Sequence, residues 1–384
     1  MNRVESNVIF GDVGGFYSLK VKWCGCQTGK HEQWRQLLKM GYVAASFRRP
    51  QTAFSTRLFE RVHLELVEGH GSMKGVCGIL KRLTEPNFPE RVDNRYVEFM
   101  RVYRWYRDLV WTIEGGGFHE PELCDIPGGL ALFCTSCAQP GVNLFEAQAD
   151  DPSWLHRIYV TMDGDFKMEQ LKQRSPESEV RLRDGQGFLV GREKYMEFLE
   201  RTEDWVQPVS RSTCNDFHNQ DHADVSVDHL MWRGIASLAC ARHGLLNNPS
   251  TPTNVKIKSL VTIYDLMCQY KVKLLERLKK GGLTQPRELQ MLYLIGKFHL
   301  GGHKDNCWAE YTLDLLLGSG RQDGEILESL WSTLNKSKST VRAMSDANRQ
   351  EFLDDLIQDS NWKKLVGGGL RPILLNYCQE LTLK

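Results

Sequence analysis

The stretch RIYVTMDGDF, residues 157–166, decides the fold that we expect for the second half of the chain. It is an apolar, β-rich run that stops abruptly at Asp163, a glycine and Asp165. A second run of the same kind, SLVTIYD at residues 259–265, stops at Asp265. Strands interleaved with helical segments predict an α/β (α+β) fold. We therefore expect both aspartates to end neighbouring strands of one central mixed sheet.

A helix with one apolar face is predicted later in the chain, in GEILESLWSTLN at residues 324–335. Its apolar residues recur at helical spacing and define a buried stripe that includes Trp331. Glu328 lies one turn before Trp331 and beside this stripe, so we expect it to be held toward the sheet edge where the aspartates end. Glu325 lies at the start of the helix, where an acidic residue favours the helix dipole and is freer to face water.

Carboxylates at these positions suggest metal-dependent chemistry. Three of them in one pocket repel one another unless cations lie between them, and Mg²⁺ or Mn²⁺ prefers such oxygen ligands. Two ions can activate a water or a 3′-hydroxyl and stabilise the leaving oxygen of a phosphodiester. Aspartates that end strands are also common turn residues, so the spacing alone is a weak signal for catalysis.

The cysteines carry a second signal. The chain has eleven of them, and its N-terminal residues show neither the basic stretch nor the apolar core of a secretory signal. Cysteines in such a chain are typical of reduced thiols or metal ligands rather than of a disulfide framework. Several are closely spaced or near a histidine, although small buried core thiols give the same pattern.

Two local pairs, Cys214-x₃-His218 and Cys240-x₂-His243, supply four ligands for one tetrahedral, structural Zn²⁺ site. Both pairs lie in a polar region at about 170–255, which we predict to be an insertion between the two aspartates. This region has too few apolar residues for a core of its own, so a zinc ion would replace that core. The replacement ligand, should His218 point away, is His222.

A second possible zinc set joins a CxC pair to a distant CxxC pair, with His31 as an additional ligand. Its four cysteines are Cys24, Cys26, Cys134 and Cys137.

A third group lies near the second aspartate. His299, His303 and Cys307 recur every four residues, which aligns them on one face if they share a helix. Cys268 follows Asp265 by three residues and could join them near the active site. Core packing around one hydrogen-bonded histidine is the alternative for this group. A phosphate contact is a further candidate role for Lys297 and His299.

The first part of the chain has mixed character. Tyr17, Leu19, Val21 and Trp23 alternate with polar residues and predict a strand. The segment 95–111 predicts an amphipathic helix whose arginines recur every three residues. Packing on a core with solvated arginines explains this pattern, and a phosphate-contacting helix is the alternative. A polar, turn-rich boundary, EAQADDPSW, then predicts two domains, 1–150 and 151–384.

The composition excludes little. The hydrophobic fraction of 41% and the charged fraction of 25% are ordinary for a folded protein. No apolar run of about 18 residues appears, so no membrane span is predicted. The net charge of +1 by itself does not favour a nucleic-acid partner, although an acidic pocket can offset a basic face in the sum.

The motifs, taken in order, resemble those of the Kyakuja–Dileera–Zisupton (KDZ) transposases. In the second half these are YVTMDGDF, YDLMCQY, KFHLGGHKDNC and GRQDGEILESLWSTLN, with STCNDFH, CARHG and AMSDANRQEFLDDLIQDSNWKK in further agreement. Upstream, CGCQTGKHEQWRQLLKMGYVAASFRRPQTAFS and FCTSCAQPGVNL resemble the cysteine-cluster domain that accompanies these transposases, mostly in fungal genomes. That cluster usually extends further upstream, so we expect the domain to be truncated here.

The resemblance implies a ribonuclease-H-like catalytic core and an Asp/Asp/Glu mechanism of DNA strand cleavage and transfer. Asp163 and Asp265 match the two family aspartates, whereas Asp165 stands where the family commonly has Asn and is a candidate extra ligand. Glu328 is our choice for the third acid, because its ExxW pattern is similar to that of related transposase superfamilies. Glu325, in the same motif, remains the alternative.

The resemblance also implies the partners: transposon ends and target DNA, Mg²⁺ or Mn²⁺ at the acids, structural Zn²⁺, a nuclear location and a homo-oligomer assembled on DNA. A domesticated or decayed relative that binds DNA or protein without cutting it is the alternative function. An unrelated zinc-stabilised interaction module is a third hypothesis, and it predicts no clustering of Asp163 with Asp265.

Overall fold

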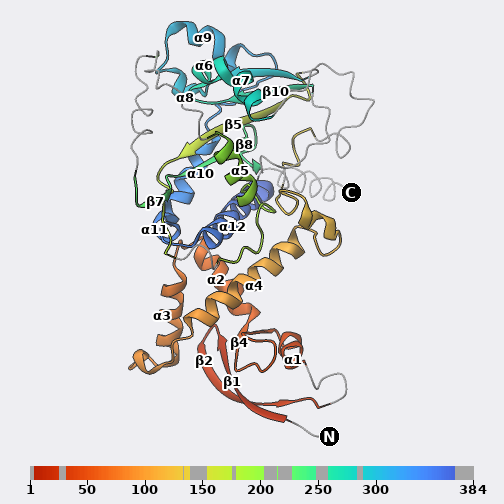
Figure 1. Cartoon of the computed structure of the whole chain (residues 1–384), viewed down its shortest axis with the longest axis vertical. Helices are drawn as coiled ribbons and strands as arrows, with labels where there is room; N and C mark the ends of the chain where they lie inside the picture. Colours follow the sequence, from red (N-terminus) through yellow and green to blue (C-terminus); the bar gives the residue numbers. More distant parts are fainter. Residues whose placement is uncertain are drawn as a thin grey trace, which may run out of the picture. The chain divides into compact units, whose positions relative to one another are not determined.

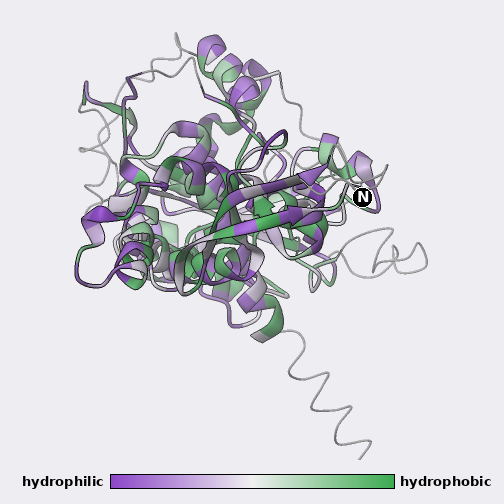
Figure 2. Cartoon of the chain, turned by 90° about the horizontal axis from the view of Figure 1, so that it is seen from below, coloured by the Kyte–Doolittle hydropathy of each residue, from purple (hydrophilic) through white to green (hydrophobic). Residues whose placement is uncertain are grey.

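The computed structural model describes residues 4–25, 32–132, 134–138, 154–174, 179–202, 214, 227–247, 258–282 and 289–367. The mixed α/β chain divides into two compact units, Met1–Phe118 and His119–Lys384 (Figure 1). Figure 2 shows hydrophobic and hydrophilic residues mixed along the helices and strands of the chain. None of the described helices is long and apolar enough to cross a membrane.

The two units divide earlier than the domain boundary that the sequence predicts near residue 150. Residues after Phe118 join the second unit because their backbone bonds to it. The amide of Gly128 donates to the carbonyl of Gly185 at 2.8 Å, and that of Leu130 donates to Gln186 at 3.1 Å. The domain limits 1–150 and 151–384 stay a prediction.

A four-stranded sheet in the order β2-β1-β4-β3 forms the base of the first unit. The predicted strand is present, but only Trp23 is fully buried, and Tyr17 and Leu19 are exposed. The elements are β1 (Val4–Asp12), β2 (Gly15–Trp23), α1 (Gln33–Lys39), β3 (Tyr42–Ala44), β4 (Thr52–Ser55), α2 (Thr56–Val67), α3 (Met73–Thr84) and α4 (Tyr96–Glu114).

Helix α4 confirms the helix predicted over 95–111 and shows what two of its arginines contact. Phe99 and Tyr103 are buried and pack against the ring of Phe59. Arg107 is also buried, with its guanidinium over the Tyr103 ring, and Arg101 donates to the Ala45 carbonyl at 2.9 Å. Two of the three regularly spaced arginines therefore make contacts within the unit.

A five-stranded mixed sheet in the order β11-β10-β5-β8-β9 is the centre of the second unit. Strands β5, β10 and β11 are parallel neighbours, whereas β8 and β9 are antiparallel. Figure 1 shows α6 to α9 gathered beside β10, while α10, α11 and α12 lie on the side of β5 and β8. The strands are β5 (Ile158–Asp165), β8 (Ile235–Cys240), β9 (Leu246–Asn247), β10 (Ser259–Ile263) and β11 (Gln290–Leu294).

The remaining elements of this unit are short, apart from α12. They are β6 (Gln170–Leu171), α5 (Arg192–Thr202), β7 (Leu230–Trp232), α6 (Met267–Tyr270), α7 (Leu274–Lys280), α8 (Lys297–Leu300), α9 (Asp305–Tyr311), α10 (Ile326–Leu334), α11 (Lys338–Arg342) and α12 (Asp346–Leu365).

The predicted insertion at about 170–255 needs a correction. Strand β8 lies inside it, yet pairs with β5 from Val160↔Cys240 to Asp165↔Ile235. Residues 235–247 therefore belong to the central sheet. The sequence did not reveal this strand, because in IASLAC only Ile235 is β-branched and four of the six residues are small.

Helix α12 holds the segment 179–192 through buried charged groups. Arg183 Nη2 lies 3.3 Å from Asp355 Oδ1, with both side chains at most 1% exposed. Asp354 Oδ1 accepts from the amides of Phe188 and Leu189 at 2.7 and 3.1 Å. Burial raises the pKa of Asp354 to about 7, although Arg183 opposes this effect. Buried charged groups therefore hold this segment against α12, where apolar packing would otherwise do so.

We expect Arg183→Met to lower the free energy of unfolding by about 3–5 kcal/mol, because it leaves the buried Asp355 carboxylate without the guanidinium. Urea denaturation measures this loss. Lys363→Met is the matched control, since its ion pair with Asp359 lies on the same helix, is 48% exposed at the lysine, and contributes less than about 1 kcal/mol. Equal losses for the two variants would contradict the role given to Arg183.

Candidate functional site

The two predicted aspartates lie at the same edge of the central sheet. Strands β10 and β5 pair in parallel, and the register runs from Leu260↔Ile158 to Ile263↔Thr161. Carried on by two residues, this register sets Asp265 opposite Asp163. The two strands are neighbours in one mixed sheet, as predicted, but Asp163 lies two residues before the end of β5 and Asp265 two residues after the end of β10.

The carboxyl groups at this edge act on one another. The pKa of Asp265 is raised to about 7, mainly by burial and also by the charges of Asp163, Glu325 and Glu328, while His299 opposes the rise. Asp163 is oriented by Trp331, whose indole Nε1 donates to Asp163 Oδ2 at 2.6 Å. The site thus concentrates negative charge where water is partly excluded.

His299, at the end of the short helix α8, lies among three of these acids. Its Nε2 is 3.4 Å from Asp265 Oδ2, 3.5 Å from Glu325 Oε2 and 4.0 Å from Glu328 Oε1. Ligand atoms of Asp265, His299 and Glu325 lie within 4.8 Å of one another. The sequence placed His299 near the site, and the structure brings it to the centre.

Glu325 and Glu328 differ from the expectation in their exposure. Glu325 is the N-terminal cap of α10 and only 16% exposed, whereas Glu328 is 60% exposed. The expectation that Glu325 would face water is wrong, because its Oε1 accepts from the amide of Phe298 at 3.1 Å. A Cβ at Gly296 would collide with this carboxylate, so only glycine allows the close approach.

Backbone contacts fix the start of α10 against its neighbours. Thr161 Oγ1 of β5 donates to the carbonyl of Gly324 at 3.0 Å, and the amide of Lys297 donates to Asp323 at 2.9 Å. Gly324 has a φ of 85°, a backbone conformation that L side chains rarely adopt. These bonds hold the glutamates of α10 beside the ends of β5 and β10.

A cavity of about 1260 Å³ opens at this edge. Among the described residues, its lining includes Glu328 but not Glu325, together with the acids of both strand ends: Asp163, Asp165 and Asp265. Asp165 is buried, and its Oδ1 accepts from the amide of Lys167 at 2.9 Å. The cavity therefore presents carboxylate oxygens of the kind that hold Mg²⁺ or Mn²⁺. Lys297, predicted as a phosphate contact, instead forms an ion pair with Asp314.

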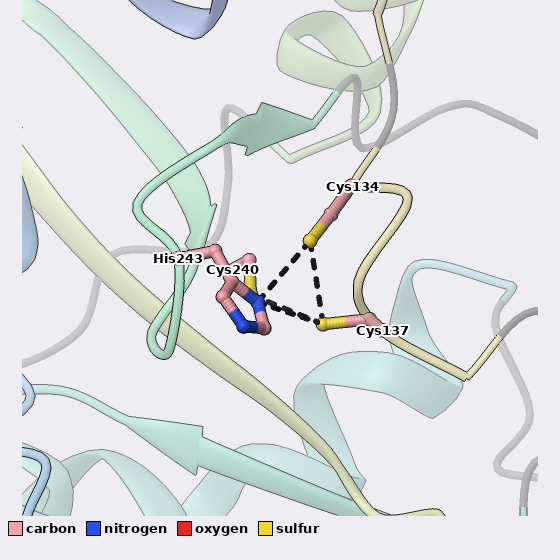
Figure 3. A group of neighbouring side chains, drawn as sticks. All are labelled: Cys134, Cys137, Cys240 and His243. Carbon is pink, nitrogen blue, oxygen red and sulfur yellow. Dashed lines mark hydrogen bonds between the residues drawn. The ribbon is translucent and has the colours of Figure 1, made fainter. Parts of the chain in front are cut away.

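A sulfur-rich cluster forms at the far end of β8, where it turns into β9 (Figure 3). His243 Nδ1 lies 3.4, 3.6 and 3.5 Å from the sulfurs of Cys134, Cys137 and Cys240, and the Cys137 and Cys240 sulfurs are 3.2 Å apart. A tetrahedral zinc with bonds of about 2.3 Å to sulfur and about 2.0 Å to nitrogen sets its ligands roughly 3.5–3.8 Å apart. This donor set could hold Zn²⁺.

The predicted groupings of the zinc ligands were wrong. Cys240 and His243 are brought together by the β8–β9 turn, in which the Gly244 amide donates to the Cys240 carbonyl at 2.7 Å, but their partners are Cys134 and Cys137. Cys214 joins a different cluster, and Cys24 is an exposed residue of the first unit. The other residues named for these sites lie outside the described part of the chain: Cys26, His31, His218 and His222.

Hydrogen bonds among the three thiols of the first cluster shift their pKa values in opposite directions. Hydrogen bonds from Cys134 and Cys137 lower the pKa of Cys240, whereas hydrogen bonds with Cys134 and Cys240 raise the pKa of Cys137. A thiolate is the form that ligates Zn²⁺, and these hydrogen bonds favour it at Cys240.

A second cluster joins Cys214 to three residues that the sequence placed near the site: Cys268, His303 and Cys307. Cys214 Sγ is 3.9 Å from Cys268 Sγ and 4.0 Å from Cys307 Sγ, and Cys268 Sγ is 3.5 Å from His303 Nδ1. Burial lowers the pKa of His303, which favours the neutral imidazole that ligates metals.

Comparison with protein families identifies both parts of the chain. The family model of the Kyakuja-Dileera-Zisupton transposase (KDZ) matches residues 156–251 and 250–361, a range that contains Asp163, Asp265 and Glu328. The model of the CxC2-like cysteine cluster associated with KDZ transposases matches residues 1–87. No curated protein and no solved structure matches the chain. The chain belongs to the KDZ transposase family.

Proposed function

We propose that this chain cleaves and joins DNA strands as a cut-and-paste transposase, with Asp163, Asp265 and Glu328 as the ligands of Mg²⁺ or Mn²⁺. One observation carries the proposal. Two aspartates from parallel neighbouring strands and a glutamate from α10 line the same cavity, within the part of the chain that matches the KDZ transposase model.

The residues of the cavity fit a hard divalent cation. Asp265 has a pKa raised to about 7 by burial and by the neighbouring acids, and a cation bound between these acids would relieve their repulsion. Bound there, one or two ions would activate the attacking water or 3′-hydroxyl and stabilise the leaving oxygen. Oxygen ligands without sulfur favour Mg²⁺ or Mn²⁺ over Zn²⁺.

Neighbouring side chains would orient the proposed ligands. Trp331 fixes one oxygen of Asp163 through its indole N–H, and His299 lies beside Asp265. Glu325 lies against the first turn of α8, where the Phe298 amide holds its carboxylate. We assign Glu325 to positioning His299, and Glu328 to the cavity, because Glu328 is exposed there and free to reach a metal ion.

The same arrangement supports a ribonuclease-H-like core for the second unit. Its sheet combines three parallel strands with an antiparallel β8–β9 pair. The glutamate helix α10 packs beside β5, as a helix must if its acid is to reach two strand ends. We infer transposon ends and target DNA as the partners, action in the nucleus, and a homo-oligomer that holds two DNA ends together.

Substitution of the three acids tests this assignment. Asp163→Asn, Asp265→Asn and Glu328→Gln should each lower metal-dependent cleavage of a terminal-repeat DNA substrate by more than the roughly 10–100-fold that loss of an outer-shell partner costs. Glu325→Gln keeps an acceptor for the Phe298 amide, so we expect a loss of about 10-fold at most. None of the three should lower the thermal transition, since these carboxylates repel one another without metal.

Normal cleavage by Glu328→Gln, with loss in Glu325→Gln, would reassign the third acid. Unchanged cleavage in all the variants would contradict the mechanism. DNA binding without metal-dependent cleavage in the unmodified chain would support a decayed relative that binds DNA but does not cut it.

We also propose that Cys134, Cys137, Cys240 and His243 bind a structural Zn²⁺. Little apolar material surrounds them: Leu245 is the one other residue of their buried cluster in the described chain. Cys137→Ser should therefore bind one zinc fewer than the unmodified chain and melt at a lower temperature. Metal analysis by mass spectrometry and thermal unfolding measure both effects. Cys124→Ser, a half-buried free cysteine outside the cluster, is the control, and zinc content unchanged by Cys137→Ser would overturn the site.

A further inference from the structure

We propose that Cys214, Cys268, His303 and Cys307 form a second zinc site, and that its metal fixes the positions of Asp265 and His299. The positioning role rests on the proposed transposase function, whereas the zinc site itself does not. Four potential ligand atoms from these residues lie within 4.8 Å of one another.

The donor set is that of a closed zinc site. Three sulfurs and one imidazole nitrogen give the Cys₃His combination that is typical of structural zinc, and soft sulfur excludes Mg²⁺. The Cys214 sulfur lies 3.9 and 4.0 Å from its two partners, close to the separation of about 3.8 Å that bonds of about 2.3 Å set. One sulfur with two equidistant partners is not the geometry of a disulfide, which joins only one pair at about 2.05 Å.

The ligands come from separate parts of the chain. Cys268 is in α6 and Cys307 in α9, His303 follows α8, and Cys214 is far from all three in sequence. A metal bound here would join the segment after β10 to the segment after β11. Cys214 and His303 are buried and the other two are half-buried, so the site is largely closed to solvent.

Both segments also carry a residue of the proposed active site. Cys268 follows Asp265 by three residues, and His303 follows His299 by four. The imidazole of His303 lies near enough to the backbone of Asp265 for that backbone to raise its pKa, against the larger effect of burial. A ligand of the second site therefore contacts a proposed ligand of the catalytic metal, and outer contacts of this kind commonly set metal affinity.

This region differs from the first cluster in having an apolar core beneath it. Met267, Ile295, Leu300 and Tyr311 are buried together there. Loss of zinc should therefore leave the sheet folded and change mainly the relative placement of Asp265 and His299. This predicts a loss of catalytic-metal affinity rather than unfolding.

Zinc content tests the site first. Cys307→Ser should bind one zinc fewer than the unmodified chain, and Cys137→Ser/Cys307→Ser two fewer, with Cys124→Ser unchanged. Equal zinc in Cys307→Ser and the unmodified chain would overturn the site.

Alkylation of the unmodified chain keeps the test independent of folding of the variants. Cys268 and Cys307 should react only after a zinc chelator is added, whereas Cys124 should react either way. Reaction of both before the chelator is added would also overturn the site.

Mn²⁺ titration followed by electron paramagnetic resonance tests the positioning role. Cys307→Ser should weaken Mn²⁺ binding by about 10–100-fold, with its circular dichroism spectrum unchanged, and Cys124→Ser should not. Unchanged Mn²⁺ affinity in a zinc-depleted Cys307→Ser would overturn the positioning role. Asp163→Asn separates the two proposals: if it leaves Mn²⁺ binding intact, the proposed catalytic site fails, while the zinc measurements still decide the second site.

Discussion

The parallel pairing of β5 with β10 is the constraint on which the rest of the second unit depends. It sets Asp163 and Asp265 side by side at the ends of two buried strands. Burial raises the pKa of Asp265 to about 7, and the neighbouring charge of Asp163 also raises it, although less than burial does. A fold that keeps this register must compensate the charge or use it to bind a cation.

Three neighbouring groups contact the acids at this edge of the sheet. His299 lies among the acids, Trp331 donates to Asp163, and the first turn of α8 takes up Glu325. These contacts separate the glutamates of α10 into two environments. Glu325 is fixed by the amide of Phe298, whereas Glu328 lines the cavity. The two acids of one motif therefore differ in what they contact.

The strand ends could be predicted from the sequence because two apolar runs stop at acids, and such runs mark buried strands without any knowledge of their partners. The zinc clusters could be predicted only as local pairs. Spacing shows that Cys134 and Cys137, or Cys240 and His243, can share an ion. It does not show which pairs meet, and Cys137 meets Cys240 across 103 residues of chain.

Three further features could not be predicted from a sequence pattern, for the same reason. Strand β8 is built mostly of small residues and is recognised by its pairing with β5 and β9. Helix α12 buries Asp354 and Asp355, which periodicity would assign to a solvated face. The burial of Glu325 likewise depends on Gly296 and α8, which lie in another segment. In each case the partner in space decides the environment.

Crystals of the full chain grown with Mn²⁺ and a terminal-repeat DNA end would test the central claim most directly. The account predicts an anomalous difference peak within bonding distance of carboxylate oxygens from Asp163, Asp265 and Glu328. A peak bound by Glu325 and His299 without Asp163, or none at this edge of the sheet, would contradict it.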